Sequence, residues 1–207
     1  MTVLDIAAIR TQFPALGRAE SGRPVAWFDG PGGSQVPQSV IDAISSFLAR
    51  GGSNHGGAFA ASRESEAVHE EARIAVADLF GTRDDDYVAF GMNMTSLNFA
   101  LSRALSADWG PGDEVVVTRL DHDANVSPWL RAAADTGATI RWVPFDTTTY
   151  RLDLDRLAAA VNARTKLVAI THASNAIGTI VDVAAATKLA HEVDALVVVD
   201  AVHYAPH

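Results

Sequence analysis

Two runs of residues, 167–170 (LVAI) and 196–199 (LVVV), are apolar at every position. A strand with one face in water alternates apolar and polar residues. A strand buried on both faces does not, as in a parallel sheet covered by helices. Segments with helical periodicity lie between these and other short apolar runs. We therefore predict an α/β fold, a three-layer α/β/α domain built on a parallel sheet.

The same patterns predict where the individual elements lie. The predicted strands are 25–28, 87–90, 114–118, 139–143, 166–171 and 196–199, and the predicted helices are 37–50, 65–80, 95–107, 128–135, 154–161 and 183–193. Pro37 suits the first position of a helix, and Gly81 and Gly137 suit helix ends. Residues 51–57 (GGSNHGG) are too rich in glycine for either element and are predicted to form a loop.

Composition excludes several classes of function. The formal charge of −9 is spread along the chain without a basic stripe, which argues against nucleic-acid binding. The chain has no cysteine, so it has no disulfide and no thiolate metal site. No apolar run is long enough to cross a membrane, and the first residues lack the pattern of a signal peptide. We expect a soluble, acidic cytoplasmic protein.

Ligands of open parallel sheets bind beyond the carboxyl ends of the strands. The polar residues directly after each predicted strand are therefore the first candidates for a binding site. After the strand at 87–90, residues 91–96 (GMNMTS) open a helix and include Thr95. Backbone N–H groups, a hydroxyl group and a helix N-terminus together suit a phosphate. Alternatively, Thr95 or Asn93 only caps the helix.

Two further segments follow strands and carry polar residues. In 121–125 (DHDAN), the side chains of Asp121, His122 and Asp123 could bind a metal, or His122 could stack on a flat ring. In 172–178 (HASNAIG), Asn175 lies just past a buried strand. Alternatively, Asn175 is only a turn residue, and Gly178 supports a turn. Neither segment distinguishes these alternatives by itself.

Asp200 is the most informative single residue, because it directly follows four apolar residues at a strand end. A carboxylate in such a half-buried place requires a partner: a helix N-terminus, a metal or a protonated ligand nitrogen. One alternative is a metal site formed by His122, Asp123, Asp200 and His203. The spacing of these four residues matches no standard metal motif.

Six segments, taken in order, resemble the class V aminotransferases, the fold-type-I group of pyridoxal 5'-phosphate (PLP) enzymes that includes the cysteine desulfurases. They are WFDGPGGSQVPQSVIDAI (27–44), SNHGGAFAAS (53–62), GMNMTSLN (91–98), LDHDANVSPW (120–129), KLVAITHASNAIGTIVDV (166–183) and VVVDAVHYAPH (197–207). One such match would be weak evidence, because short motifs recur by chance. Six in family order make the resemblance specific.

The resemblance implies PLP as the cofactor and assigns roles to matching positions. Thr95 and the backbone at Met94 would hold the phosphate. His122 would stack over the pyridine ring and help to move protons. Asp200 would pair with the protonated ring nitrogen, which keeps the ring an electron sink.

The resemblance places Asn175 and His203 near the phenolic oxygen of the cofactor. The family more often has Gln at the position of His203. Ser96 and Asp123 also depart from the usual family residues. These departures indicate a divergent, cysteine desulfurase-like subgroup.

The Schiff-base lysine of this family lies beyond the segment of Asp200, and Lys166 and Lys188 do not match it. We therefore expect a fragment, incomplete at its C-terminus and inactive alone. Residues 1–24 would belong with a small domain, and residues 25–207 would form part of the PLP-binding large domain.

The full-length protein is expected to be a homodimeric enzyme that acts on an amino acid by desulfuration, transamination or elimination. Two alternatives stay open at this point. One is a catalytically dead homologue that acts as a binding protein, and the other is a metal-dependent hydrolase.

Overall fold

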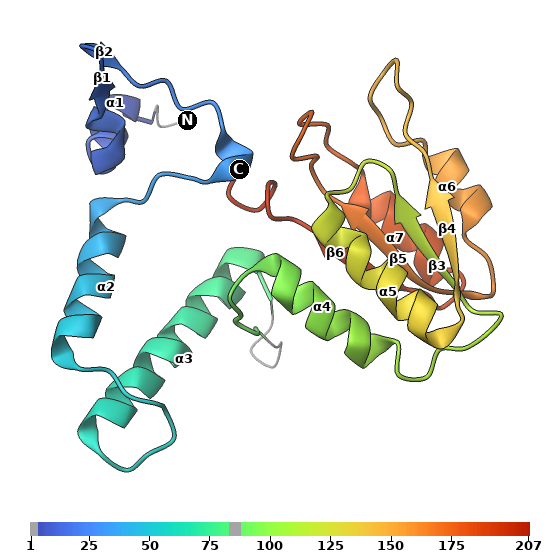
Figure 1. Cartoon of the computed structure of the whole chain (residues 1–207), viewed down its shortest axis with the longest axis horizontal. Coiled ribbons are helices and arrows are strands. Elements are labelled where there is room, and N and C mark those ends of the chain that lie inside the picture. The colour runs from blue at the N-terminus through green and yellow to red at the C-terminus, as the bar shows by residue number, and fades with distance from the viewer. Residues whose placement is uncertain (1–3, 83–87) are drawn as a thin grey trace. The chain divides into compact units, whose positions relative to one another are not determined.

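The computed structural model describes residues 4–82 and 88–207. The chain divides into two compact units, Met1–Ala89 and Phe90–His207 (Figure 1). The predicted boundary after residue 24 is a different division, and it stays a prediction.

The second unit contains a four-stranded sheet in the order β4-β3-β5-β6. The strands are β3 (Glu114–Thr118), β4 (Thr139–Val143), β5 (Thr165–Thr171) and β6 (Leu196–Asp200). All three neighbouring pairs are parallel. These four strands confirm the predicted parallel sheet, with bounds within a residue of those expected.

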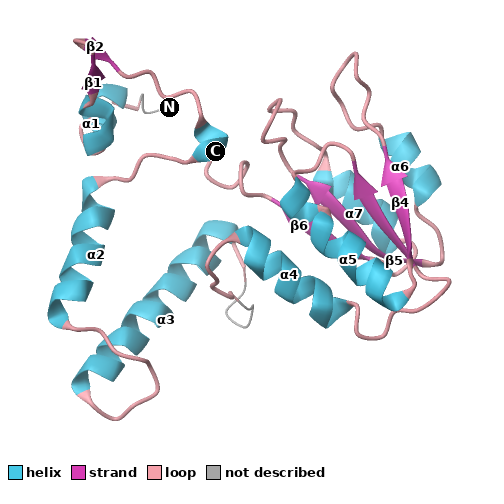
Figure 2. Ribbon diagram, viewed as in Figure 1, coloured by secondary structure: helices cyan, strands magenta, loops and turns pink. Residues whose placement is uncertain are grey.

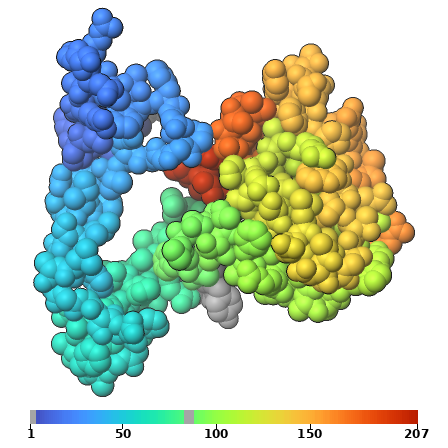
Figure 3. All heavy atoms as spheres, viewed as in Figure 1, coloured from blue at the N-terminus to red at the C-terminus, as the bar shows by residue number. Residues whose placement is uncertain are grey.

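Helices cover both faces of this sheet. The helices of the unit are α4 (Met94–Leu105), α5 (Ser127–Thr136), α6 (Leu154–Ala160) and α7 (Val183–His191). Figure 2 shows α5 on one face and α6 and α7 on the other, and in Figure 3 the atoms of α5 lie on the visible face. The three-layer prediction is therefore confirmed.

Successive residues of the central strands point to opposite faces and form two cores. Val115 and Val117 pack with Trp129 of α5 on one face. Val116 packs with Leu157 of α6 on the other. All five side chains are fully buried. A strand can be apolar at every position only because both of its faces are covered in this way.

The two apolar runs that led to the prediction differ in their burial. The β5 run is buried along its whole length. The β6 run is not, because Leu196 is 52% exposed and Val199 is 37% exposed. Burial of β6 on both faces was therefore predicted wrongly. β6 is an edge strand of the described sheet, so one side of it has no neighbouring strand to cover it.

The first unit is mainly helical. It contains α1 (Ile6–Arg10), a two-residue hairpin of β1 (Ala19–Glu20) and β2 (Arg23–Pro24), α2 (Gln38–Arg50) and α3 (Ala60–Phe80). Short 3-10 turns lie at Pro14–Gly17 and Gly30–Gly32. None of the described helices in either unit is long and apolar enough to span a membrane.

Two predicted strands and one helix start were wrong. Residues 25–28 and 88–90 are not in strands, and residue 87 lies outside the described residues. An apolar run becomes a strand only where another strand offers hydrogen bonds, and the sheets found in residues 4–82 and 88–207 include neither segment. Helix α3 begins at Ala60, five residues before the predicted start at 65.

Helix ends follow the predicted glycines. Gly81 and Gly137 end α3 and α5 in the left-handed conformation, with φ of 64° and 81°. Pro37 is the N-cap of α2 and not its first helical residue, so the helix begins one residue later than predicted. The predicted loop at 51–57 is confirmed.

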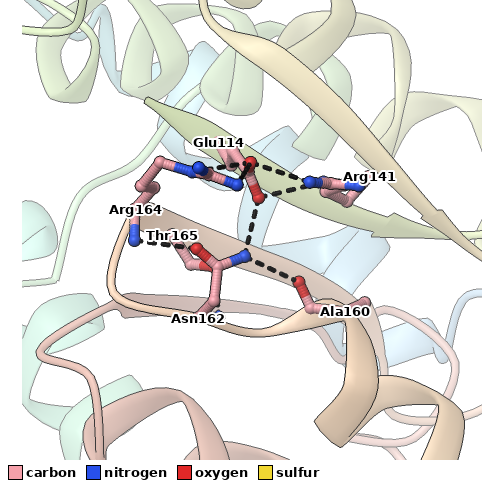
Figure 4. Close-up of polar contacts among 6 residues, drawn as sticks. All are labelled: Glu114, Arg141, Ala160, Asn162, Arg164 and Thr165. Atoms are coloured by element: carbon pink, nitrogen blue, oxygen red, sulfur yellow. Dashed lines mark hydrogen bonds and ion pairs between the residues drawn. The ribbon is translucent and has the colours of Figure 1, made fainter. Parts of the chain in front are cut away.

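A buried carboxylate ties the amino end of the sheet together. Glu114, the first residue of β3, is only 4% exposed. It accepts hydrogen bonds from Nε and Nη2 of Arg141 at 2.9 Å, from Nε of Arg164 at 2.9 Å and from Nδ2 of Asn162 at 2.8 Å (Figure 4). Arg141, followed by Asn162, lowers the pKa of Glu114 to about 2. This cluster joins β3 to β4 and to the segment that leads into β5.

Replacement of Glu114 by Gln should lower the free energy of unfolding by about 2 kcal/mol at pH 7, because charge-assisted bonds are lost at a buried site. The folded-state pKa is depressed, so this stabilisation is present above about pH 4.5 and is lost as the pH falls toward 2. Urea unfolding of both proteins between pH 7 and pH 3 measures it. Arg156→Gln, at an exposed pair with Asp153, is the control and should change little. A Gln variant as stable as the wild type at pH 7 would contradict this account.

Candidate cofactor site

Three of the four polar segments meet at the carboxyl edge of the sheet. Thr118, Thr171 and Asp200 end the neighbouring strands β3, β5 and β6. Thr171 and Asp200 lie directly opposite each other in the β5–β6 register. His122 follows β3 by four residues, and Asn175 follows β5 by four. Parallel pairing therefore brings residues together that are up to 82 positions apart in the chain.

The fourth segment begins α4. Asn93 is the N-cap, and its Oδ1 accepts hydrogen bonds from the backbone N–H of Ser96 at 2.9 Å and from its hydroxyl group at 3.0 Å. The capping alternative is thus correct for Asn93 and wrong for Thr95. Thr95 is exposed, and its hydroxyl and N–H groups have no hydrogen-bond partner among residues 4–82 and 88–207. Met94 is half-buried.

His122 is exposed and begins the short turn η3 (Asp123–Asn125). Its Nδ1 accepts a hydrogen bond from the N–H of Ala124 at 3.1 Å. That bond places the proton of the neutral ring on Nε2, which stays available to donate. Asp123 is also exposed and accepts a bond from the hydroxyl group of Ser127 at 2.7 Å.

Asp200 is a nearly buried carboxylate with a free oxygen. It is 9% exposed, and its Oδ1 accepts a hydrogen bond from the N–H of Val202 at 3.0 Å. Its Oδ2 accepts none from the described part of the chain. A carboxylate in this setting gains much from a positively charged donor. His203 is half-buried in the turn that follows.

The segments after β5 and β6 are held by local contacts. Asn175 is half-buried in a turn in which the N–H of Gly178 bonds to the carbonyl group of Ser174, and Gly178 has a φ of 69°. The predicted turn is therefore confirmed. The ring of His172 stacks on that of Tyr204, with centroids 3.4 Å apart and an angle of 21°. This stack joins the end of β5 to the turn that carries His203.

Sequence reasoning missed a polar network formed by residues on both sides of His122 in the chain. Asp121 accepts a bond from Asn125 Nδ2 at 2.7 Å and one from the hydroxyl group of Thr118. Burial raises the pKa of Asp121 to about 6, against the opposing effect of Thr118 and Asn125. Asn98 of α4 bonds to Asn125 Oδ1 at 3.0 Å. One sequence feature could have indicated this network. Asn98 and Ser102 are polar residues one helical turn apart, and both lie on the buried face of α4.

The metal alternative has no geometric support. A metal site needs at least three ligating side chains around one point. Across residues 4–82 and 88–207, no group of three or more His, Cys, Asp or Glu side chains is placed to hold a metal ion. His122, Asp123, Asp200 and His203 therefore do not form one.

The arrangement fits PLP in three respects. A phosphate needs free donors, and Thr95 at the start of the twelve-residue helix α4 has them. A protonated pyridine nitrogen needs a carboxylate, and Asp200 has an oxygen without a partner in the described residues. A flat ring needs a flat face, and the exposed imidazole of His122 offers one.

Comparison with known proteins identifies the family of the chain. The sequence matches the family Aminotransferase class-V over residues 26–207. A probable cysteine desulfurase of Mycolicibacterium paratuberculosis is 37% identical, over 99% of this chain and 30% of that protein. A cysteine desulfurase of Escherichia coli has a TM-score of 0.85 at 30% identity, over all of this chain and 51% of that one.

A more distant structure, a C-DES variant with glycine covalently linked to its PLP cofactor, has a TM-score of 0.76, over 94% of this chain and 50% of that one. Its 22% identity supports a likeness of fold alone. The chain thus spans about half the length of these two solved structures. It spans less than a third of the length of the curated relative from Mycolicibacterium paratuberculosis. The resemblance inferred from six sequence segments is confirmed, and the chain belongs to the class-V aminotransferase family.

Proposed function

We propose that this chain supplies the PLP-binding part of a cysteine desulfurase-like enzyme that acts on an amino acid. The observation that carries the proposal is Asp200, a nearly buried carboxylate with a free oxygen at the sheet edge that also bears His122. Desulfuration, transamination and elimination all use the same property of PLP. When bound, it withdraws electrons from the carbon next to the substrate amine.

Each site residue has one task in this proposal. The hydroxyl group of Thr95 and the backbone N–H groups at the start of α4, including that of Met94, bind the phosphate. Asp200 would hold the proton on the ring nitrogen through its free oxygen, because an ion pair favours the charged form of both groups. His122 would cover one face of the ring, and its Nε2 would give or take a proton. Asn175 and His203 would lie toward the phenolic oxygen.

The two lysines do not belong to this site. Lys166 is the second residue of β5, at the opposite end of the strand, and its Nζ lies 3.5 Å from Asp113 Oδ1. Lys188 is exposed on α7. We propose that the 207-residue chain binds PLP without a covalent bond and does not turn over substrate alone.

The proposal extends to the full-length protein. Residues 25–207 form part of its large domain, and residues 1–24 belong with a smaller one. We propose that this protein is a cytoplasmic homodimer, as the resemblance implies.

Replacement of Asp200 by Asn should weaken PLP binding by about tenfold or more, or about 1.4 kcal/mol. Asn keeps the size of the side chain and removes the charge that pairs with the ring nitrogen. Titration with PLP, followed by absorbance and tryptophan fluorescence, measures the dissociation constant. Asp155→Asn on the exposed surface of α6 is the matched control and should bind as the wild type does. Equal affinity for both variants would contradict the proposed role of Asp200.

Borohydride treatment of the chain with PLP should leave no stoichiometric PLP adduct on Lys166 or Lys188. Neither amine lies at the carboxyl edge where the other site residues meet. Peptide mass spectrometry measures the adducts, and the Asp200→Asn variant is the control for random surface labelling. A full adduct on one lysine that disappears in this variant would show that the lysine reaches the site, and the proposal of non-covalent binding would fail.

A further inference from the structure

The carboxyl group of Asp121 is bound on both of its oxygens. Asn125 Nδ2 donates to Oδ1 at 2.7 Å, and the hydroxyl group of Thr118 contacts Oδ2. The same hydroxyl oxygen accepts a bond from the N–H of Leu120 at 3.1 Å. Asp121 thus joins the end of β3 to η3, the turn that follows His122.

The contacts continue from Asn125 into two helices. Its Oδ1 accepts bonds from Asn98 Nδ2 at 3.0 Å and from the indole N–H of Trp129 at 3.4 Å. Asn98 Nδ2 also donates to the carbonyl group of Ala124 at 2.8 Å. Asn98 belongs to α4, one turn after its first residues, and Trp129 belongs to α5. The network therefore spans β3, η3, α4 and α5.

We propose that Asp121 is a positioning residue of the cofactor site, whose carboxyl group fixes the loop of His122 against the start of α4. The proposal rests on the proposed function, because His122 and Thr95 are the groups that it would hold at the right separation. Asp121 acts through Asn125, which is fully buried.

The protonation state of Asp121 follows from its surroundings. Burial raises its pKa to about 6, and the negative charge of Asp200 adds to that effect. The other charged or titratable groups nearby either contact an aromatic ring or are exposed to solvent. Arg119 lies 3.7 Å over the ring of Trp142, and Asp123 and His122 are exposed. His172 stacks on Tyr204.

Two effects on the protonation of Asp121 oppose each other. Burial favours the neutral carboxylic acid, whereas the hydrogen bonds donated by Thr118 and Asn125 favour the carboxylate. Burial is the larger effect, so Asp121 is protonated below about pH 6.

The sign of the pH effect on stability follows. The pKa of Asp121 is raised from 3.8 to about 6 in the folded chain. Its contribution to stability is therefore fully present below about pH 4 and is lost as the pH rises through 6. Asn resembles the protonated acid, with one acceptor oxygen and donor hydrogens, but it does not titrate. Ala removes the contacts at every pH.

The first experiment needs no cofactor. Asp121→Asn should unfold at a higher urea concentration than the wild type at pH 7.5 and at a similar one at pH 4. Asp121→Ala should unfold at a lower urea concentration than Asp121→Asn at both pH values. The NMR signal of the Trp129 indole N–H should titrate with a midpoint near pH 6 in the wild type and stay constant in Asp121→Asn. Asp123→Asn, at an exposed neighbouring carboxylate, is the control and should keep the titration. A Trp129 signal that still titrates in Asp121→Asn would overturn the proposal.

The second experiment measures PLP binding by the same proteins. Asp121→Ala should bind PLP at least about tenfold more weakly than the wild type. Asp121→Asn should bind PLP within about threefold of the wild type, a difference in binding free energy of about 0.65 kcal/mol. Equal affinity of Asp121→Ala and the wild type would overturn the positioning role. If the wild type itself does not bind PLP, the proposed function fails. The Trp129 titration then decides alone whether Asp121 controls the loop of His122.

Discussion

Strand β5 is the element on which the rest of the second unit depends. It pairs in parallel with β3 on one side and β6 on the other, and its apolar run is fully buried. Parallel pairing aligns the carboxyl ends of the three strands, so the polar residues that follow them must meet at one edge. Hydrophobic burial of Leu167–Ile170 is thus the force that assembles His122, Asn175 and Asp200.

Buried carboxyl groups at the two edges of this sheet have pKa values shifted in opposite directions. At the amino edge, arginines surround Glu114 and lower its pKa to about 2, so the charge is neutralised and the site is structural. At the carboxyl edge, Asp121 has amide and hydroxyl partners, and burial raises its pKa to about 6. Asp200 keeps an oxygen free of partners among the described residues. This oxygen of Asp200 can therefore pair with a positively charged atom of a ligand.

Much of this arrangement could be predicted from local pattern. The bounds of β3 and β4, the glycine ends of α3 and α5, and the strand-end position of Asp200 follow from periodicity and turn chemistry. The segments 25–28 and 88–90 have the same apolar character but are not strands, because a strand also needs a partner that local sequence does not specify. Asp121 looked like one of three equivalent polar residues in a loop, since burial cannot be read from DHDAN.

The sequence alone therefore determined the fold class, the family and the set of polar strand ends, because each depends on residues close together in the chain. Tertiary structure decided which of those polar residues are buried, paired or free. It made Asn93 a cap and left Thr95 available. It exposed His122 and placed Asp121 within a network with Asn98 and Asn125, up to 27 positions apart. Such differences arise from packing between distant segments, which sets solvent access and hydrogen-bond partners that no local pattern encodes.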